Sequence, residues 1–123
     1  MKIRIKGNSL RMRLTKTEVD EFGKTGYIEE RTEFGDNMLV YALQSKQGLS
    51  QLEASFEAGK ITMSVPEEMR TRWTTTEDVG YDHKMPIGNG KHLFLLLEKD
   101  WVCLDNTFED QSDNYPNPNA AGS

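Results

Sequence analysis

The chain has 123 residues, a mass of 14.1 kDa and a net charge of −5, with 36% hydrophobic and 28% charged residues. These values are typical of one globular domain, and they exclude a mainly disordered chain or an integral membrane protein. No window resembles a membrane span or a signal peptide, and the single cysteine, Cys103, has no partner for an internal disulfide. We therefore expect a cytoplasmic protein in which Cys103 is a core residue.

The first 17 residues contain six basic side chains and no acid. Residues 1–14 alternate twice between apolar and basic positions across a Gly-Asn-Ser break, which predicts an antiparallel hairpin. The basic side chains would then share one face, where like charges opposite one another are destabilising unless an anion compensates them. The candidate anion-binding residues are Lys2, Arg4, Lys6, Arg11 and Arg13.

Two short helices are predicted. Thr15 and Glu18 fit a capping box, in which each side chain accepts a hydrogen bond from the other residue's backbone amide. The second helix opens at Pro66, followed by two acids, and proline and negative charge are both tolerated in a first turn. Met69 and Trp73, four residues apart, give this helix an edge that faces the core.

Alternating segments predict two further hairpins, over residues 27–43 and 52–65. The first of these hairpins carries acids that could compensate the basic hairpin, namely Glu29, Glu30 and Glu33. The acidic C-terminal segment is the other candidate. We expect one of the two to lie against the basic face.

Residues 93–97 read Leu-Phe-Leu-Leu-Leu, an unbroken run of large hydrophobic side chains. Five residues are too few to cross a bilayer, and a Gly-Asn-Gly turn precedes them, so the run predicts a strand buried on both faces. Residues 79–86 predict a weaker strand, and Pro86 places it at a sheet edge.

These elements predict an α+β fold over residues 1–110, with no internal repeat visible in the sequence. It is mainly an antiparallel sheet of successive hairpins, about seven or eight strands that could curl into a half-barrel, covered by two short helices. Residues 111–123 are expected to be an acidic, Asn- and Pro-rich tail that is partly disordered.

An enzymatic site is a competing interpretation. Asp82 and His83 are adjacent, His92 is the other histidine, and Cys103 is a conceivable nucleophile. Neighbours in a strand point to opposite faces, however, so adjacency alone does not make a dyad. These four residues remain weak catalytic candidates.

A divalent-cation site is a third interpretation. The segment after residue 104 is rich in oxygen ligands, and Asp110, Ser112 and Asn114 match the first positions of an EF-hand loop. The match then fails at Tyr115, where the loop requires glycine. The weak metal candidates are Asp105, Glu109, Asp110 and Asp113, and we expect no cofactor.

The opening MKIRIKGNSLRMRLTKTEVDEF, the central LLEKDWVCLD and the closing EDQSDNYPNP together resemble a family of small bacterial proteins with no assigned function. The resemblance covers nearly the full chain. It implies no activity, substrate or catalytic residue, and it directs attention to the basic hairpin and the acidic tail together.

We therefore expect a non-enzymatic binding or accessory module whose basic hairpin meets an acidic protein segment or a small anion. Sheets that bind single-stranded nucleic acid place aromatic rings among basic residues, and residues 1–21 contain no aromatic side chain. This absence argues against nucleic acid as the partner. A membrane partner is not expected, and oligomerisation through an open sheet edge is left open.

Overall fold

The structure is a computed structural model that describes residues 1–102 and 115–116. In chain order its elements are β1 (Lys2–Lys6), β2 (Ser9–Leu14), α1 (Lys16–Thr25), β3 (Tyr27–Glu33), β4 (Met38–Lys46), β5 (Glu53–Glu57), β6 (Lys60–Pro66), α2 (Glu67–Thr75), β7 (Gly80–Gly88), β8 (Lys91–Lys99), β9 (Trp101–Val102) and β10 (Tyr115–Pro116). The predicted α+β class, the hairpins and the two short helices are confirmed.

The strands β1 to β8 form two four-stranded sheets, where the sequence predicted mainly one antiparallel sheet. Sheet A has the order β1-β2-β8-β7 and sheet B the order β3-β4-β6-β5. Each sheet joins two antiparallel hairpins through a central parallel pair, β2 with β8 and β4 with β6. The sheets are therefore mixed. Hairpin pairing is local and could be read from turns, whereas the parallel pairing joins segments distant in sequence and could not.

The described fold contains a repeated unit that the sequence did not reveal. β1-β2-α1-β3-β4 and β5-β6-α2-β7-β8 follow the same order of hairpin, helix and hairpin. Each unit gives one hairpin to each sheet, so the strand order of sheet B repeats that of sheet A. The repeat explains why both sheets have a parallel pair at their centre.

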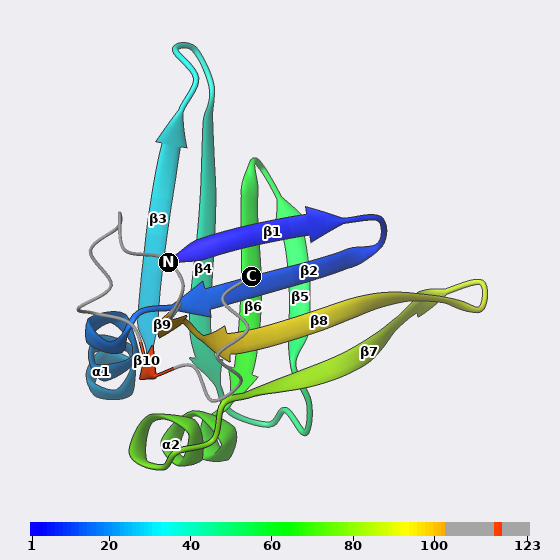
Figure 1. Cartoon of the computed structure of the whole chain (residues 1–123). Helices are drawn as coiled ribbons and strands as arrows, with labels where there is room; N and C mark the ends of the chain where they lie inside the picture. The colour runs from blue at the N-terminus through cyan, green and yellow to red at the C-terminus, as the bar shows by residue number, and fades with distance from the viewer. Residues whose placement is uncertain (103–114, 117–123) are drawn as a thin grey trace.

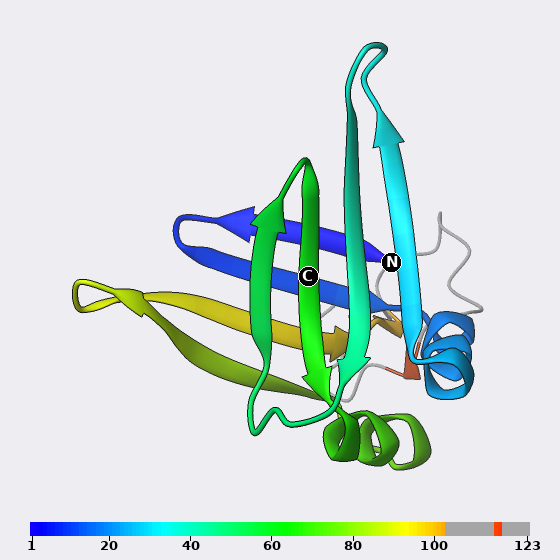
Figure 2. The ribbon, with the colours of Figure 1, turned by 180° about the vertical axis from the view of Figure 1, so that it is seen from behind.

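The two sheets pack face to face, with the strands of one running across those of the other (Figure 1). Buried side chains from both sheets and both helices form one core. The two helices lie together at one end of the sandwich, as the reverse view also shows (Figure 2), and join through an edge-on contact of Phe22 and Trp73 with ring centroids 6.4 Å apart. Trp73 is fully buried and its indole nitrogen donates to the Val79 carbonyl, 3.2 Å away.

The capping box of α1 is present as predicted. Thr15 accepts from the Glu18 amide, and Glu18 accepts from the Thr15 amide. The buried amino group of Met1 forms ion pairs with Glu18 and with Glu30, the latter at 3.2 Å. Glu30 therefore pairs with the N-terminal amino group and not with the basic side chains of the first hairpin. No helix among the described residues is long and apolar enough to cross a membrane.

The prediction that residues 93–97 are buried on both faces is wrong. Leu95 and Leu97 in β8 are fully buried and point into the core, whereas Phe94 between the core-facing positions is 42% exposed. One face of β8 packs on the core and the other is open to solvent. The open side of sheet A is the surface on which the candidate site lies.

Candidate anion-binding site

The outer face of sheet A gathers the basic side chains that the sequence singled out. Leu10, Met12 and Leu14 of β2 are buried in the core, so the alternate residues of β2 point outward. Residues paired across a sheet share a face, and β1 is paired in register with β2. The outer residues of the hairpin are Lys2, Arg4, Lys6, Ser9, Arg11 and Arg13. The predicted common basic face is thus formed.

Two acids near the end of β8 neutralise part of this face. Glu98 accepts from the Arg11 Nε at 2.6 Å, and its Oε1 lies 3.7 Å from the Arg13 Nε. Lys2 Nζ lies 3.1 Å from the Asp100 carboxylate. Among the described residues, Arg4 and Lys6 have no ion-pair partner. Positive charge therefore remains at one end of the face.

The predicted compensating acids lie elsewhere. Glu29 belongs to the outer face of sheet B, where it accepts from Tyr27 at 2.5 Å and from Arg31 at 2.8 Å. The hydrogen bond from Tyr27, with that from Arg31, lowers the pKa of the Glu29 carboxyl. Lys60 donates to the Tyr27 hydroxyl at 2.8 Å. Glu29 is thus paired within sheet B and does not compensate the basic face of sheet A. The acidic tail, the other predicted partner, lies outside the described residues.

Two adjoining hollows of about 270 Å³ each open on the basic face. The first is lined by Arg4, Lys6, Ser9, Leu10, Arg11, Phe94 and Leu96. The second shares Arg4 and Arg11 with it and adds Lys2, Ile3 and Arg13. Both fall just below the volume of about 300–1,000 Å³ that encloses a typical ligand. A small anion could sit in the first hollow, with part of any larger ligand in solvent.

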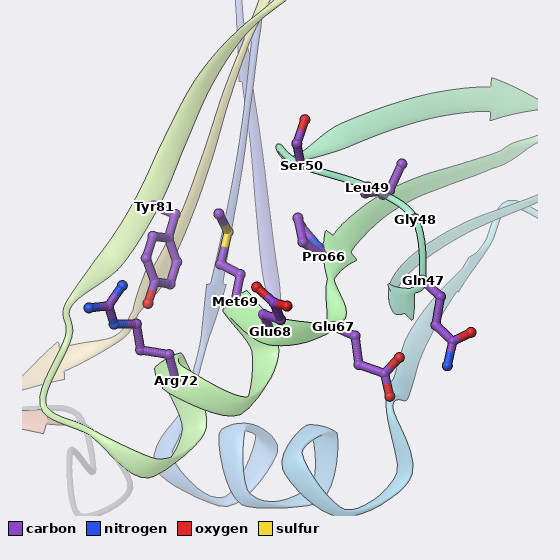
Figure 3. A pocket seen from close by; sticks show the side chains of 10 residues that line it. All are labelled: Gln47, Gly48, Leu49, Ser50, Pro66, Glu67, Glu68, Met69, Arg72 and Tyr81. Atoms are coloured by element: carbon purple, nitrogen blue, oxygen red, sulfur yellow. The ribbon is translucent and has the colours of Figure 1, made fainter.

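A larger cavity of about 690 Å³ lies at the start of α2 (Figure 3). Arg72 and Tyr81 face each other on one side of it, and both contact Asp78, at 3.7 Å and 2.8 Å. Glu67 pairs with Arg70 at 3.9 Å. Glu68 is then the one charged lining residue that lacks a partner within the described part of the chain. Because its other charges are already paired, this cavity presents less net charge to a ligand than the basic face.

The enzymatic candidates are not brought together. Asp82 and His83 are neighbours in β7, so their side chains leave opposite faces of sheet A. His92 shares the outer face with Asp82, but Asp82 is paired with Leu96, four residues along β8 from His92. At about 3.3 Å per residue, this separates them by about 13 Å. Cys103 lies outside the described residues.

The described residues contain no group of three His, Cys, Asp or Glu side chains that could hold a metal ion. The metal candidates of the sequence, Asp105, Glu109, Asp110 and Asp113, fall in the segment that the structure does not describe. The divalent-cation site therefore stays a prediction.

Phe94 is the residue of this site that sequence reasoning missed. It is paired with Ser9 of β2 on one side and with Lys84 of β7 on the other. The sequence did contain an indication of this exposed face. His92 and Glu98 are separated from Phe94 by an even number of residues in β8, so all three lie on the same face, and His and Glu would be poor core residues. This spacing indicates that one face of β8 is exposed to solvent.

No curated protein and no solved structure matches the chain. A family model described as "Family of unknown function (DUF7009)" matches residues 1–119. The match spans both sheets, both helices and every residue of the basic face. The chain is therefore a member of the DUF7009 family.

Proposed function

We propose that the protein is a non-enzymatic binding module that takes up an anion on the basic outer face of sheet A. The observation that carries the proposal is the hollow lined by Arg4, Lys6 and Arg11, two of whose cations have no partner among the described residues. As part of the proposal, the module works in the cytoplasm, in keeping with a chain that has a single thiol.

Unpaired cations on one face indicate a binding function, because their mutual repulsion lowers the stability of the fold. Arg4 lies directly opposite Arg11 in the hairpin, and like charges in that position lower the stability of a sheet. A bound anion would remove the repulsion and would accept hydrogen bonds from both guanidinium groups. The planar guanidinium suits a phosphate or carboxylate in particular, since it offers two parallel donors.

The test is a calorimetric titration of the full chain with inorganic pyrophosphate in about 0.1 M salt. We expect the double variant Arg4→Gln/Lys6→Gln to bind at least 10-fold more weakly than the parent chain. The matched control is Lys16→Gln/Lys24→Gln, which removes two exposed lysines from α1 and therefore the same charge. It should change the affinity by less than about 2-fold, since exposed charges beyond a Debye length of about 10 Å are largely screened at 0.1 M salt.

Two results would reject the proposal. One is a parent chain that gives no binding heat with pyrophosphate. The other is an equal loss of affinity in both double variants, which would mean that net charge alone attracts the anion. Thermal unfolding of each variant verifies that the fold is retained.

A further inference from the structure

We infer that the anion is a mononucleotide, with its phosphate at Arg4 and Lys6 and its base against Phe94 and Leu96. This inference rests on the proposed function and deepens it, because it names the class of ligand. The first hollow has an apolar floor, which a simple inorganic anion would leave exposed.

The floor consists of two outward-facing side chains of β8. Phe94 is 42% exposed, and Leu96 beside it is partly exposed. Both line the same hollow as the unpaired cations. An aromatic ring at the edge of a positively charged patch is the pattern that holds a nucleobase, since every base has a face that can stack on a ring.

The strand register places the charged and apolar parts of the hollow side by side. One row across sheet A reads Lys6, Ser9, Phe94 and Lys84, and the next reads Arg4, Arg11, Leu96 and Asp82. With about 4.8 Å between strands, the first strand and β8 are about 10 Å apart. A phosphate and a base joined by one sugar can span that distance.

Other exposed phenylalanines have different neighbours. Phe34 and Phe56 are 68% and 69% exposed, but they follow Glu33 and precede Glu57. Neither phenylalanine lines any of the four hollows identified among the described residues. Phe94 is therefore distinguished by the hollow that it shares with Arg4 and Lys6, not by its exposure.

The size and charge of the site favour a single nucleotide over a nucleic acid. Arg4 and Lys6, which have no acid partner among the described residues, occupy two neighbouring rows about 7 Å apart along the strands. Glu98 and Asp82 limit the positive strip at its other borders. A chain with a net charge of −5 would also repel a long polyanion.

The experiment compares ligands that differ by one part. Adenosine, guanosine and uridine monophosphates are titrated into the full chain beside ribose 5-phosphate, which lacks only the base, and beside an eight-residue oligothymidylate. We expect each monophosphate to bind roughly 5- to 100-fold more tightly than ribose 5-phosphate, the range that stacking of one base supports. Phe94→Leu should abolish that advantage, whereas the control Phe56→Leu should retain it.

A second measurement does not depend on a variant. Nuclear Overhauser effects between ring protons of Phe94 and base protons of the bound nucleotide are expected, and their absence from a saturated complex would contradict the stacking. Equal affinity for ribose 5-phosphate and the nucleotides would overturn the inference while leaving pyrophosphate binding, and thus the proposed function, in place. Tighter binding of the oligonucleotide than of a monophosphate would overturn it in favour of a polymer. Failure to bind any anion would remove both.

Discussion

Arg4 and Arg11 stand directly opposite each other on the outer face of β1-β2, yet among the described residues only Arg11 has a carboxylate partner. Glu98 accepts from the Arg11 Nε at 2.6 Å. The two arginines are therefore equivalent in position and different in role. Arg11 contributes to the fold through Glu98, while Arg4 carries charge that the described structure does not use.

Arg4→Gln is expected to leave the free energy of unfolding unchanged or to raise it, by up to about 1 kcal/mol, because the substitution removes repulsion across the hairpin. Urea denaturation at low salt measures the change. The matched variant Arg11→Gln loses the partly buried pair with Glu98 and should lower the free energy by about 1 kcal/mol. Equal destabilisation by both substitutions would show that Arg4 has a structural partner.

Glu98→Gln should separate stability from binding. The substitution removes the acid that engages Arg11 and Arg13, so we expect a loss of about 1 kcal/mol in the free energy of unfolding. The two freed guanidinium groups should raise the affinity for pyrophosphate several-fold at low salt. Calorimetry gives the affinity and urea denaturation the stability. A weaker affinity would mean that Glu98 positions Arg11 for the ligand.

Whether the sequence predicts a feature of this fold depends on how far apart along the chain the residues that determine the feature are. The capping pair Thr15 and Glu18 and the Gly-Asn-Gly turn at residues 88–90 are local, and both were predicted correctly. The parallel pairing of β2 with β8 joins segments more than 80 residues apart. Period-2 alternation shows which face of a strand is apolar but not which strand lies beside it.

The same limit applies to the site. The common face of Arg4 and Arg11 follows from alternation within one hairpin and was predicted. The place of Phe94 follows from the pairing of β8 with β2, which no local pattern contains. Residues 1–21, whose lack of aromatic side chains argued against nucleic acid, include only one hairpin of this face. A sheet assembles its outer face from several strands, and the ring comes from β8.

Gly80 is required by close packing of two backbones. A Cβ atom at this position would lie 2.0 Å from the Leu97 carbonyl oxygen and 3.0 Å from the Glu98 Cα. Backbone atoms cannot move aside as a flexible side chain can, so Gly80→Ala should cost about 3 kcal/mol or more. The control is Gly7→Asn, where the space is open and asparagine tolerates the positive φ of 55°. Thermal unfolding compares the two, and a stable Gly80→Ala chain would contradict the close approach of β7 to β8.

Tyr81 is expected to make stability depend on pH in the alkaline range. Burial, together with a 2.8 Å hydrogen bond that its hydroxyl donates to Asp78, raises the pKa of Tyr81 to about 12 from a model-compound value of 10.0. Above pH 10 the unfolded chain loses the phenolic proton while the folded chain keeps it. The unfolded state then binds fewer protons, so stability falls as pH rises from 10 towards 12.

Lys99 acts with the opposite sign at lower pH, because burial lowers the pKa of its ammonium group below 10.5. In the window just below pH 10.5 the unfolded chain binds a proton that the folded chain has released, so this group makes stability rise with pH. Tyr81→Phe isolates the phenol, since Lys99 is present in both chains. The difference in the free energy of unfolding between the parent chain and Tyr81→Phe should be constant from pH 7 to 9 and should shrink between pH 10 and 11. Urea denaturation at each pH measures it, and a difference that stays constant to pH 11 would show that folding does not shift the phenol's titration.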